Sequence, residues 1–170
     1  VNETHEQRSR SVNVSDSPWR DTGPVWTSDT TLIFLSDRER QYDIFMVASD
    51  DEEQSDIFET LKHRTVRVTS TGEDESALTV SPDGGKISFV RGNGTLIVAD
   101  ISAEGKLSGE KKLLNGWSIP AGMAWSPDGK WLAYALEDLN FDSEIYIHAA
   151  DGSSDPVNVS MHPRGDFGPV

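Results

Sequence analysis

The stretch Ala124 to Ala135 reads AWSPDGKWLAYA, and two other stretches of the chain resemble it. They are TVSPDGGKISFV, from Thr79 to Val90, and VWTSDTTLIFLS, from Val25 to Ser36. Each contains one residue, here called the anchor, just before a four-residue turn and an apolar segment; the anchors are Trp26, Val80 and Trp125. Successive anchors are 54 and 45 residues apart. A pattern that returns at such a spacing indicates a repeat architecture.

Each unit contains four short apolar segments bounded by turn residues. In the second segment apolar residues alternate with others, as at Ile87 and Phe89, and this period of two predicts a strand with one buried face. The turn SPDG supports a tight antiparallel connection, because proline presets φ and glycine accepts the positive φ that we expect at Gly129. The first unit has TSDT at this place, which predicts a looser turn.

Four strands in every unit predict an all-β fold, namely a β-propeller segment of about three four-stranded antiparallel blades. A closed ring would need about six or seven blades. Two other all-β folds are less consistent with the repeat. The sequence of a β-sandwich is not expected to repeat, and a parallel β-helix repeats with a much shorter period. The predicted blades are residues 26–79, with an acidic insertion, residues 80–124, and residues 125–170, which include the start of a next blade. Residues 1–25 hold the end of a preceding blade and the start of blade one.

The two ends of the repeat region are also alike. SVNVSDSPWRDTGPV, from Ser11 to Val25, and PVNVSMHPRGDFGPV, from Pro156 to Val170, share most of their residues without a gap. We interpret VNVS as the same outer strand in both, and GPV as the inner strand of the blade that follows. The sequence therefore predicts a piece of a longer propeller.

The composition excludes several classes of function. The chain has 15 Lys and Arg against 29 Asp and Glu, a net charge of -14, which would repel nucleic acid at long range. No apolar run is long enough to cross a bilayer, and the polar start VNETHEQRSR is unlike a signal peptide. Cysteine is absent, which excludes disulfides and thiolate chemistry.

No catalytic or metal-binding motif is present in the sequence. GxSxG, HExxH, GxxxxGK[ST] and GxGxxG do not occur. The histidines are isolated, and His148 aligns with Val47 and Ala99, so we expect it to pack in a strand. The acidic run SDDEEQSD, Ser49 to Asp56, lacks the glycine and ligand spacing of an EF-hand. We therefore expect a solvated loop there, no metal and no cofactor, and an enzyme in its own right is disfavoured.

Several phrases of the sequence resemble a known repeat. PVWTSD, TVSPDGGKISF and AWSPDGKWLAYALEDLNFDSEIYIHAADG are similar to the Trp-Ser-Pro-Asp-Gly-Lys repeats of the TolB type, which occur in TolB, in the N-terminal propellers of tricorn-like serine peptidases and in prolyl-oligopeptidase relatives. LSDRERQYDIFMVASDD and the insertion before KHRTVRVTS most resemble the tricorn-like group. That resemblance implies that Ser, His and Glu for catalysis come from separate domains, so this chain would carry no catalytic residue.

Candidate binding residues lie on the connections at one end of the predicted blades. Loops held by a rigid scaffold commonly carry function, and aromatic and arginine side chains are typical of binding hot spots. Arginine can also grip a peptide carboxylate at two points. The candidates are Trp19, Arg20, Arg38, Arg91, Trp117, Phe141, His162 and Arg164, with Arg40 beside them. The alternative is that they are ordinary loop residues or plugs of the core. For Trp26 and Trp125 we expect core packing.

The sequence thus predicts a non-catalytic propeller segment of a tricorn-like serine peptidase, which would guide or filter peptides toward a separate catalytic domain. The alternative is a TolB-like protein–protein interaction scaffold attached to no enzyme. Expected partners are peptides or unfolded protein chains, and copies of the chain itself through open blade faces, which would expose apolar area. Neither nucleic acid nor a membrane is expected. Bacterial relatives are often exported, which favours the periplasm, with the cytoplasm as the alternative.

Overall fold

The computed structural model describes residues 12–28, 30–137, 142–160 and 169, and the structural statements below refer to these residues. They form three four-stranded antiparallel sheets. The first sheet holds β1 (Asp21–Ser28), β2 (Thr31–Ser36), β3 (Asp43–Ser49) and β4 (His63–Arg67). The second holds β5 (Glu75–Val80), β6 (Lys86–Arg91), β7 (Thr95–Ile101) and β8 (Leu107–Asn115). The third holds β9 (Ala121–Trp125), β10 (Trp131–Glu137), β11 (Ser143–Ala149) and β12 (Val157–Asn158).

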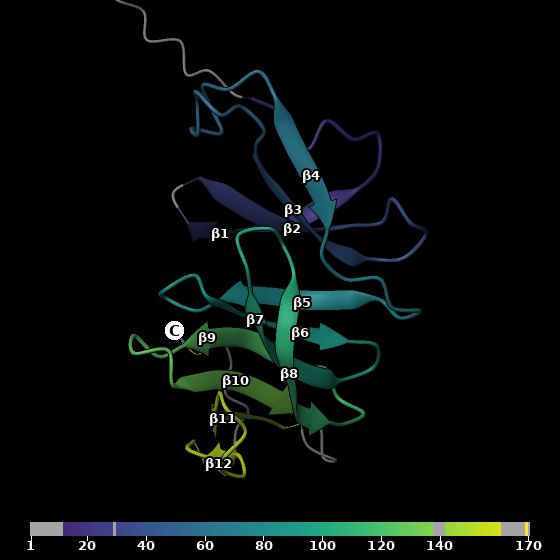
Figure 1. Cartoon of the computed structure of the whole chain (residues 1–170). Helices are drawn as coiled ribbons and strands as arrows, with labels where there is room; N and C mark the ends of the chain where they lie inside the picture. Colours follow the sequence, from purple (N-terminus) through teal and green to yellow (C-terminus); the bar gives the residue numbers. More distant parts are fainter. Residues whose placement is uncertain (1–11, 29, 138–141, 161–168, 170) are drawn as a thin grey trace, which may run out of the picture.

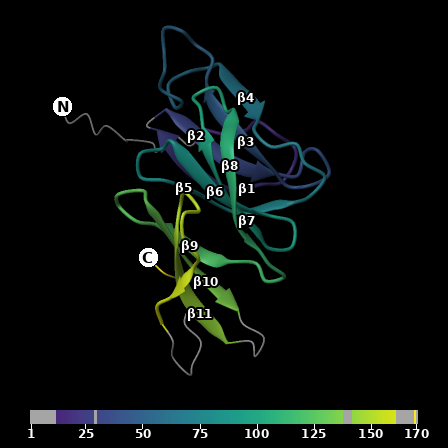
Figure 2. The same ribbon diagram turned by 60° about the horizontal axis from the view of Figure 1, so that its bottom comes forward.

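The sheets follow one another in chain order, and within each sheet the strands pair in sequence order. They succeed one another from top to bottom in Figure 1, and the turned view of Figure 2 keeps the second sheet between the other two. Neighbouring sheets meet through their first strands, since β5 contacts β1 and β2, and β9 contacts β5. This arrangement matches part of a β-propeller, and the predicted all-β fold of three four-stranded blades is confirmed.

The three anchors occupy corresponding places in the three sheets. Trp26 pairs with Leu32, Val80 with Ile87, and Trp125 with Leu132. The equivalence extends to the third strand, where Val47, Ala99 and His148 pair with these same three residues of the second strand. The repeat seen in the sequence is therefore a repeat of strand register, and the predicted alignment of His148 is correct.

Each first strand also contains the same irregularity, three residues before the anchor. The register shifts there, and the residue has a positive φ: 60° at Gly23, 50° at Ala77 and 58° at Gly122. A β-bulge with its first residue in the left-handed region bends the strand and suits glycine, which has no Cβ to clash. Ala77 adopts this conformation without being glycine, so the bulge of the second sheet holds local backbone strain that the bulges of the other two sheets lack.

The SPDG turns have the predicted geometry. Gly84 and Gly129 have φ values of 72° and 68°, which confirms the positive φ expected at Gly129. In the first of these turns the Asp83 carboxylate accepts a hydrogen bond from the Ser81 hydroxyl at 2.6 Å. This bond is the main cause of the lowered pKa of Asp83. The looser turn predicted for TSDT includes residue 29, which lies outside the described residues.

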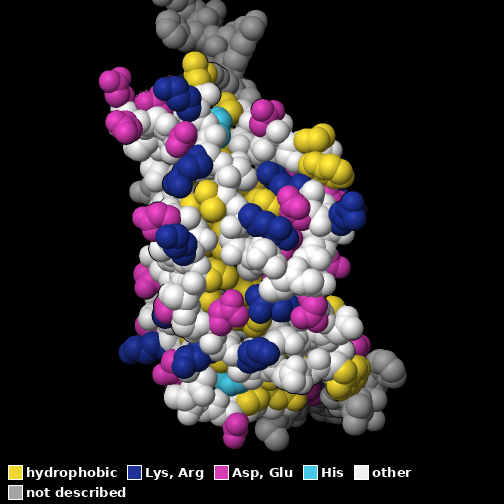
Figure 3. Space-filling model, turned by 45° about the vertical axis from the view of Figure 1, so that its right-hand side comes forward, with side chains coloured by type: hydrophobic (Ala, Val, Ile, Leu, Met, Phe, Trp, Pro, Cys, Tyr) yellow, Lys and Arg dark blue, Asp and Glu magenta, His cyan; other side chains and the backbone are white. Residues whose placement is uncertain are grey.

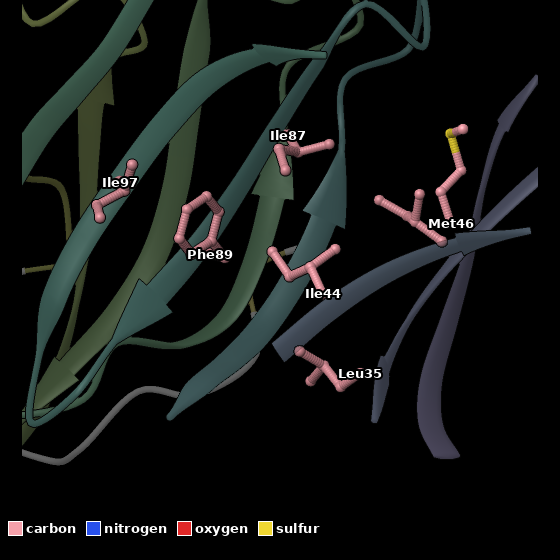
Figure 4. Close-up of a cluster of buried hydrophobic side chains, with 7 residues drawn as sticks. Leu35, Ile44, Met46, Ile87, Phe89 and Ile97 are labelled. Atoms are coloured by element: carbon pink, nitrogen blue, oxygen red, sulfur yellow. The ribbon is translucent and has the colours of Figure 1, made fainter. Parts of the chain in front are cut away.

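Apolar side chains fill the space between successive sheets. Between the first and second sheets, buried side chains point toward one another from both sides (Figure 4); they are Ile33, Leu35, Ile44, Met46, Ile87, Phe89 and Ile97. Between the second and third sheets the buried residues are Val90, Leu96, Val98, Leu113, Leu132 and Tyr134. The alternating residues of the second and third strands thus serve two cores, because successive side chains point to opposite faces of a sheet.

The outward face of the first sheet is covered, contrary to the expectation that both end faces are open. Phe34, Phe45 and Val47 are buried on this face beneath Ile57, which belongs to the insertion between β3 and β4 and is itself buried. Val14 packs against the same cluster. The sequence shows the insertion but not that one of its apolar residues reaches back over the sheet.

Two further expectations need correction. Residues 12–15, the first copy of VNVS, form no strand, whereas the second copy contains β12. Trp26 is 46 % exposed instead of packed in the core, and its ring lies 6.0 Å from that of Phe58, in the insertion. Trp125 does pack against the core between the second and third sheets. Among the described residues no helix is long and apolar enough to span a membrane.

Candidate functional site

One end of the sheets, here called the loop end, brings together connections from different sheets. It carries the connections β2–β3, β4–β5, β6–β7 and β8–β9. The first two are joined directly, because the Tyr42 backbone N–H donates to Asp74 Oδ1 at 2.7 Å and the Glu75 N–H donates to the Tyr42 carbonyl at 2.7 Å. The loop end is therefore one continuous surface over the first and second sheets.

Arg38, one of the predicted binding residues, is held inside the first sheet. Its Nε donates to Ser36 Oγ at 2.8 Å, and its Nη2 lies 3.3 Å from Asp21 Oδ1. The guanidinium carbon stands 4.4 Å from the centroid of the Phe45 ring, a cation–π distance. These contacts give Arg38 a structural role, and its role in binding stays a prediction.

Arg91 is held in the same way in the second sheet. Its Nε donates to Glu75 Oε1 at 3.0 Å, its Nη1 donates to Glu110 Oε2 at 3.3 Å, and its guanidinium carbon lies 5.3 Å from the centroid of the Phe89 ring. Arg38 likewise lies over a ring of the second strand, because its guanidinium carbon is 5.5 Å from the centroid of Phe34. An acid at the start of the first strand, an aromatic ring on the second strand and an arginine at or beyond its end thus recur in two sheets. Arg91 differs from Arg38 because it also lines a groove, described below.

The other predicted binding residues lie apart from this arrangement. Trp19 and Trp117 are 58 % and 60 % exposed, and Arg20 and Arg40 are exposed too. Phe141, His162 and Arg164 lie outside the described residues. Among the described candidates, Arg38, Arg91 and Trp117 belong to three different sheets, and the role of all eight candidates in binding stays a prediction.

Trp117 lines an open apolar hollow at the loop end of the third sheet, here called the tryptophan hollow. Its volume is about 490 Å³, and its walls include Trp117, Ile119, Ala121, Ala135, Glu137 and Ser143. Ile119 is 53 % exposed, so two large apolar side chains that are two residues apart in the sequence face solvent. Exposed apolar surface in a hollow is typical of a binding site.

A second hollow, here called the inter-sheet groove, runs between the outer strands of the first and second sheets. It has a volume of about 620 Å³ and is lined by residues 66–71, by the β7–β8 connection from Glu104 to Leu107, and by Arg91 and Glu110. Lys and Arg lie interspersed with Asp and Glu on the face of the molecule that Figure 3 shows. The groove is thus lined by charges of both signs.

Two buried carboxylates lie behind the arginines of the groove. Asp43 Oδ2 accepts a hydrogen bond from Arg67 Nη2 at 2.6 Å, and Glu75 Oε1 accepts one from Arg91. Both carboxylate side chains are completely buried. The second oxygens, Asp43 Oδ1 and Glu75 Oε2, have no hydrogen-bond partner among the described residues. For Glu75, burial disfavours the ionised form.

The pKa of Glu75 is raised accordingly. Burial raises its pKa from 4.5 to about 7, although the hydrogen bond from Arg91 acts in the opposite direction. The nearby charge of Asp43 raises it further. Near neutral pH Glu75 therefore carries its proton for part of the time, and Arg91 then lacks a full counter-charge at its Nε side.

Arg67, Asp43 and Glu75 do not appear among the residues predicted from the sequence. One signal in the sequence could have pointed to the two acids. Asp43, in YDIFMV, and Glu75, in EDESALTV, each stand at the start of an apolar strand, and both strands begin at the loop end. Acids at such places are expected to need a cation. The cation that pairs with Asp43 comes from β4, and the alternation of RTVRVT alone does not show which arginine turns inward.

The described residues contain no group of three or more His, Asp or Glu side chains placed to hold a metal ion. The one buried histidine among them, His148, has its Nδ1 3.4 Å from the Tyr134 hydroxyl, inside the core between the second and third sheets. Burial lowers the pKa of His148 and raises that of Tyr134, so both are neutral at pH 7. This pair packs the core instead of facing a cleft.

Comparison with known proteins identifies the fold but not a family. Neither a protein-family model nor a curated protein sequence matches the chain. Among solved structures, a putative TolB from Agrobacterium tumefaciens is 18 % identical with a TM-score of 0.55, over 81 % of this chain and 45 % of that one. A puromycin-hydrolyzing peptidase from Mycobacterium tuberculosis is 13 % identical with a TM-score of 0.56, over 81 % of this chain and 20 % of the peptidase.

A third similar structure comes from a study of two prolyl endopeptidases; it is 16 % identical with a TM-score of 0.52, over 85 % of this chain and 20 % of that one. This chain thus spans a fifth of the two peptidases and under half of the TolB protein. The likeness shows a propeller-type fold that peptidases and TolB share, at identities too low to show a family.

Proposed function

We propose that this chain is a non-catalytic propeller segment of a tricorn-like serine peptidase, and that it guides or filters peptides toward a separate catalytic domain. The observation that carries the proposal is the tryptophan hollow: Trp117 and Ile119 stand exposed at its rim, on a loop held by a rigid sheet. An apolar hollow of this kind suits the side chains of an unfolded or extended polypeptide.

Two other observations support the peptidase part of the proposal. Propellers of similar structure occur in proteins described as peptidases. The repeats of this chain also resemble those of the tricorn-like group in LSDRERQYDIFMVASDD and in the insertion that follows. In such an arrangement the propeller acts by size and charge, and the chemistry belongs to another domain.

The second candidate is a TolB-like scaffold that binds a protein partner and belongs to no enzyme. The structural similarity to a putative TolB favours it. Labelling the full-length gene product with a fluorophosphonate probe for active serines separates the two. A labelled serine, lost on heat denaturation, is the result expected for the peptidase. A full-length product that takes no label would leave only the scaffold.

Peptide capture is tested with the 170-residue chain itself. We expect fluorescently labelled, C-terminally amidated peptides rich in Leu and Phe to bind with roughly micromolar affinity in an anisotropy titration. Trp117→Ala should weaken binding roughly tenfold, because truncating an exposed aromatic anchor removes most of its contact. Leu61→Ala is the matched control, since Leu61 is 86 % exposed but lies in the insertion on the first sheet. Absence of any binding would refute the proposal.

A further inference from the structure

We infer that Trp26 and Phe58, here called the aromatic pair, form a docking surface for a short basic segment of a partner protein. Trp26 stands near the end of β1, and Phe58 belongs to the connection between β3 and β4, which lies at the end of the first sheet opposite the loop end. The inference goes beyond the proposed function, because it concerns a protein partner and uses none of the residues that line the tryptophan hollow. In Figure 1 the connection before β4 lies at the end of the molecule away from the third sheet.

The exposure of Trp26 departs from the pattern of the repeat. The anchors of the second and third sheets, Val80 and Trp125, pack against the core between their own sheet and the preceding one. Trp26 has the same register, yet it is 46 % exposed. Phe58 is 48 % exposed, and the centroids of the two rings are 6.0 Å apart. Two neighbouring aromatic rings thus face solvent, and a partner that covered them would gain a large apolar contact.

The insertion decides what kind of partner can reach these rings. On the second and third sheets the corresponding face is covered by a neighbouring sheet. On the first sheet Ile57 packs against Phe34, Phe45 and Val47, and Ile57 itself is 1 % exposed. Another sheet could therefore stack on this face only by displacing Ile57. A short segment can cover the aromatic pair and leave Ile57 in place, so we infer a segment.

The charge around the aromatic pair selects a basic partner. The connection from Asp50 to Lys62 contains one lysine and six acids: Asp50, Asp51, Glu52, Glu53, Asp56 and Glu59. Among the described residues, Asp50 is the one of these acids with an ion pair, to Arg64 at 3.9 Å, and both side chains are exposed. A surface so little neutralised attracts cations. It repels anionic membranes, nucleic acid and the same surface of a second copy.

The turn that carries Phe58 is held in place, which prepares the ring for binding. The Phe58 N–H donates to Asp56 Oδ1 at 2.8 Å, and the N–H groups of Glu59 and Thr60 donate to the Asp56 carbonyl at 3.2 and 2.9 Å. A ring that is already positioned loses little conformational entropy on binding. Lysine and arginine can place their charge over an aromatic face, and Glu59, exposed beside Phe58, adds a counter-charge.

The experiment uses a labelled peptide made of Lys, Arg and Leu, acetylated and amidated at its ends, in an anisotropy titration with the 170-residue chain. A second peptide has Gln in place of every Lys and Arg. We expect the basic peptide to bind roughly tenfold more tightly than the Gln peptide, because only the basic one can pair with the acids and stack its cations on the rings. The ratio of the two affinities is the quantity followed in the variants.

The variants test whether the preference belongs to the aromatic pair. Phe58→Ala should remove most of it, and so should Trp26→Leu, which keeps an apolar side chain on the sheet. Leu61→Ala is the matched control, because Leu61 is 86 % exposed in the same connection but lies outside the pair. Glu59→Gln should reduce the preference more than Glu73→Gln, which removes the same charge from an exposed acid at the loop end.

Two results would overturn the inference. One is equal binding of the basic peptide and the Gln peptide by the natural chain. The other is a preference that survives both Phe58→Ala and Trp26→Leu, because the basic peptide would then be attracted by the acidic protein as a whole. Neither result bears on the proposed function, which is tested with apolar peptides and Trp117→Ala.

Discussion

Glu75 should make the stability of the fold depend on pH in an unusual direction. A carboxyl group whose pKa in the folded state lies above its value in the unfolded chain binds its proton more tightly when folded. The free energy of unfolding therefore decreases as the pH rises from 4.5 toward about 7, the interval over which the unfolded chain has lost the proton and the folded protein has not. Most carboxylates in ion pairs act in the opposite direction.

The size of the effect follows from the two pKa values. The difference between 4.5 and about 7 corresponds to about 3 kcal/mol, since each tenfold change in proton affinity is worth about 1.4 kcal/mol. Most of this change falls between about pH 5 and pH 8.5. Complete burial of the side chain makes the conversion appropriate, because little solvent screens the group.

Glu75→Gln is the informative change, because glutamine resembles the protonated acid and does not titrate. We therefore expect the free energy of unfolding of the variant minus that of the natural protein to increase by about 2–3 kcal/mol from about pH 5 to pH 8.5. Urea unfolding followed by circular dichroism at several pH values measures this difference.

Glu110→Gln is the control, since Glu110 contacts the same arginine but is 42 % exposed. Measured over the same pH range, this variant shows how much of any pH dependence comes from the contact with Arg91 and not from residue 75. The reasoning is refuted if the difference for Glu75→Gln is constant across this range, because Glu75 would then titrate in the folded protein as it does in the unfolded chain.

Three further predictions concern backbone strain and packing. Ala77→Gly should stabilise the fold by about 0.5–1 kcal/mol in urea unfolding, because glycine relieves the positive φ of 50°, and an unchanged or lower stability would contradict the assigned strain. Gly84→Ala should destabilise by more than about 3 kcal/mol, since the added Cβ would lie 1.8 Å from the Thr27 carbonyl oxygen. Gly129→Ala should lose only about 1 kcal/mol, because its Cβ would make only an ordinary contact, 4.0 Å from Pro82 Cδ; equal effects would contradict this. Ile57→Ala should destabilise by about 2–5 kcal/mol by leaving a cavity over the first sheet, and a melting temperature equal to that of the natural chain would show that the insertion does not cover the sheet.

Much of the fold can be predicted from the sequence because its information is local and repeated. The anchors, the SPDG turns and the alternating second segments each depend on a few neighbouring residues, and three copies support one another. The structure places Trp26, Val80 and Trp125 in the same register, as this reasoning requires. Departures from the repeat mark where prediction fails.

The insertion between β3 and β4 is one such departure. Its acidic composition predicts a solvated loop, but the burial of Ile57 depends on a contact with Phe34 and Phe45 that no local pattern encodes. The inter-sheet groove shows the same limit of prediction from local sequence. Arg91 can be chosen from the sequence because it follows an apolar strand, whereas its neighbour Arg67 becomes part of the groove only through the packing of one sheet against the next.

The hydrogen bonds that tie the β2–β3 connection to the start of β5 have a consequence for how the molecule opens. Tyr42 donates one hydrogen bond and accepts another across the boundary between the first two sheets, at 2.7 Å each. The β6–β7 turn is joined to the β8–β9 connection by a longer bond, from the Gly116 N–H to the Gly94 carbonyl at 3.4 Å. Amide hydrogen exchange should therefore show the first eight strands losing protection together, as one cooperative unit, while the last four exchange earlier and independently.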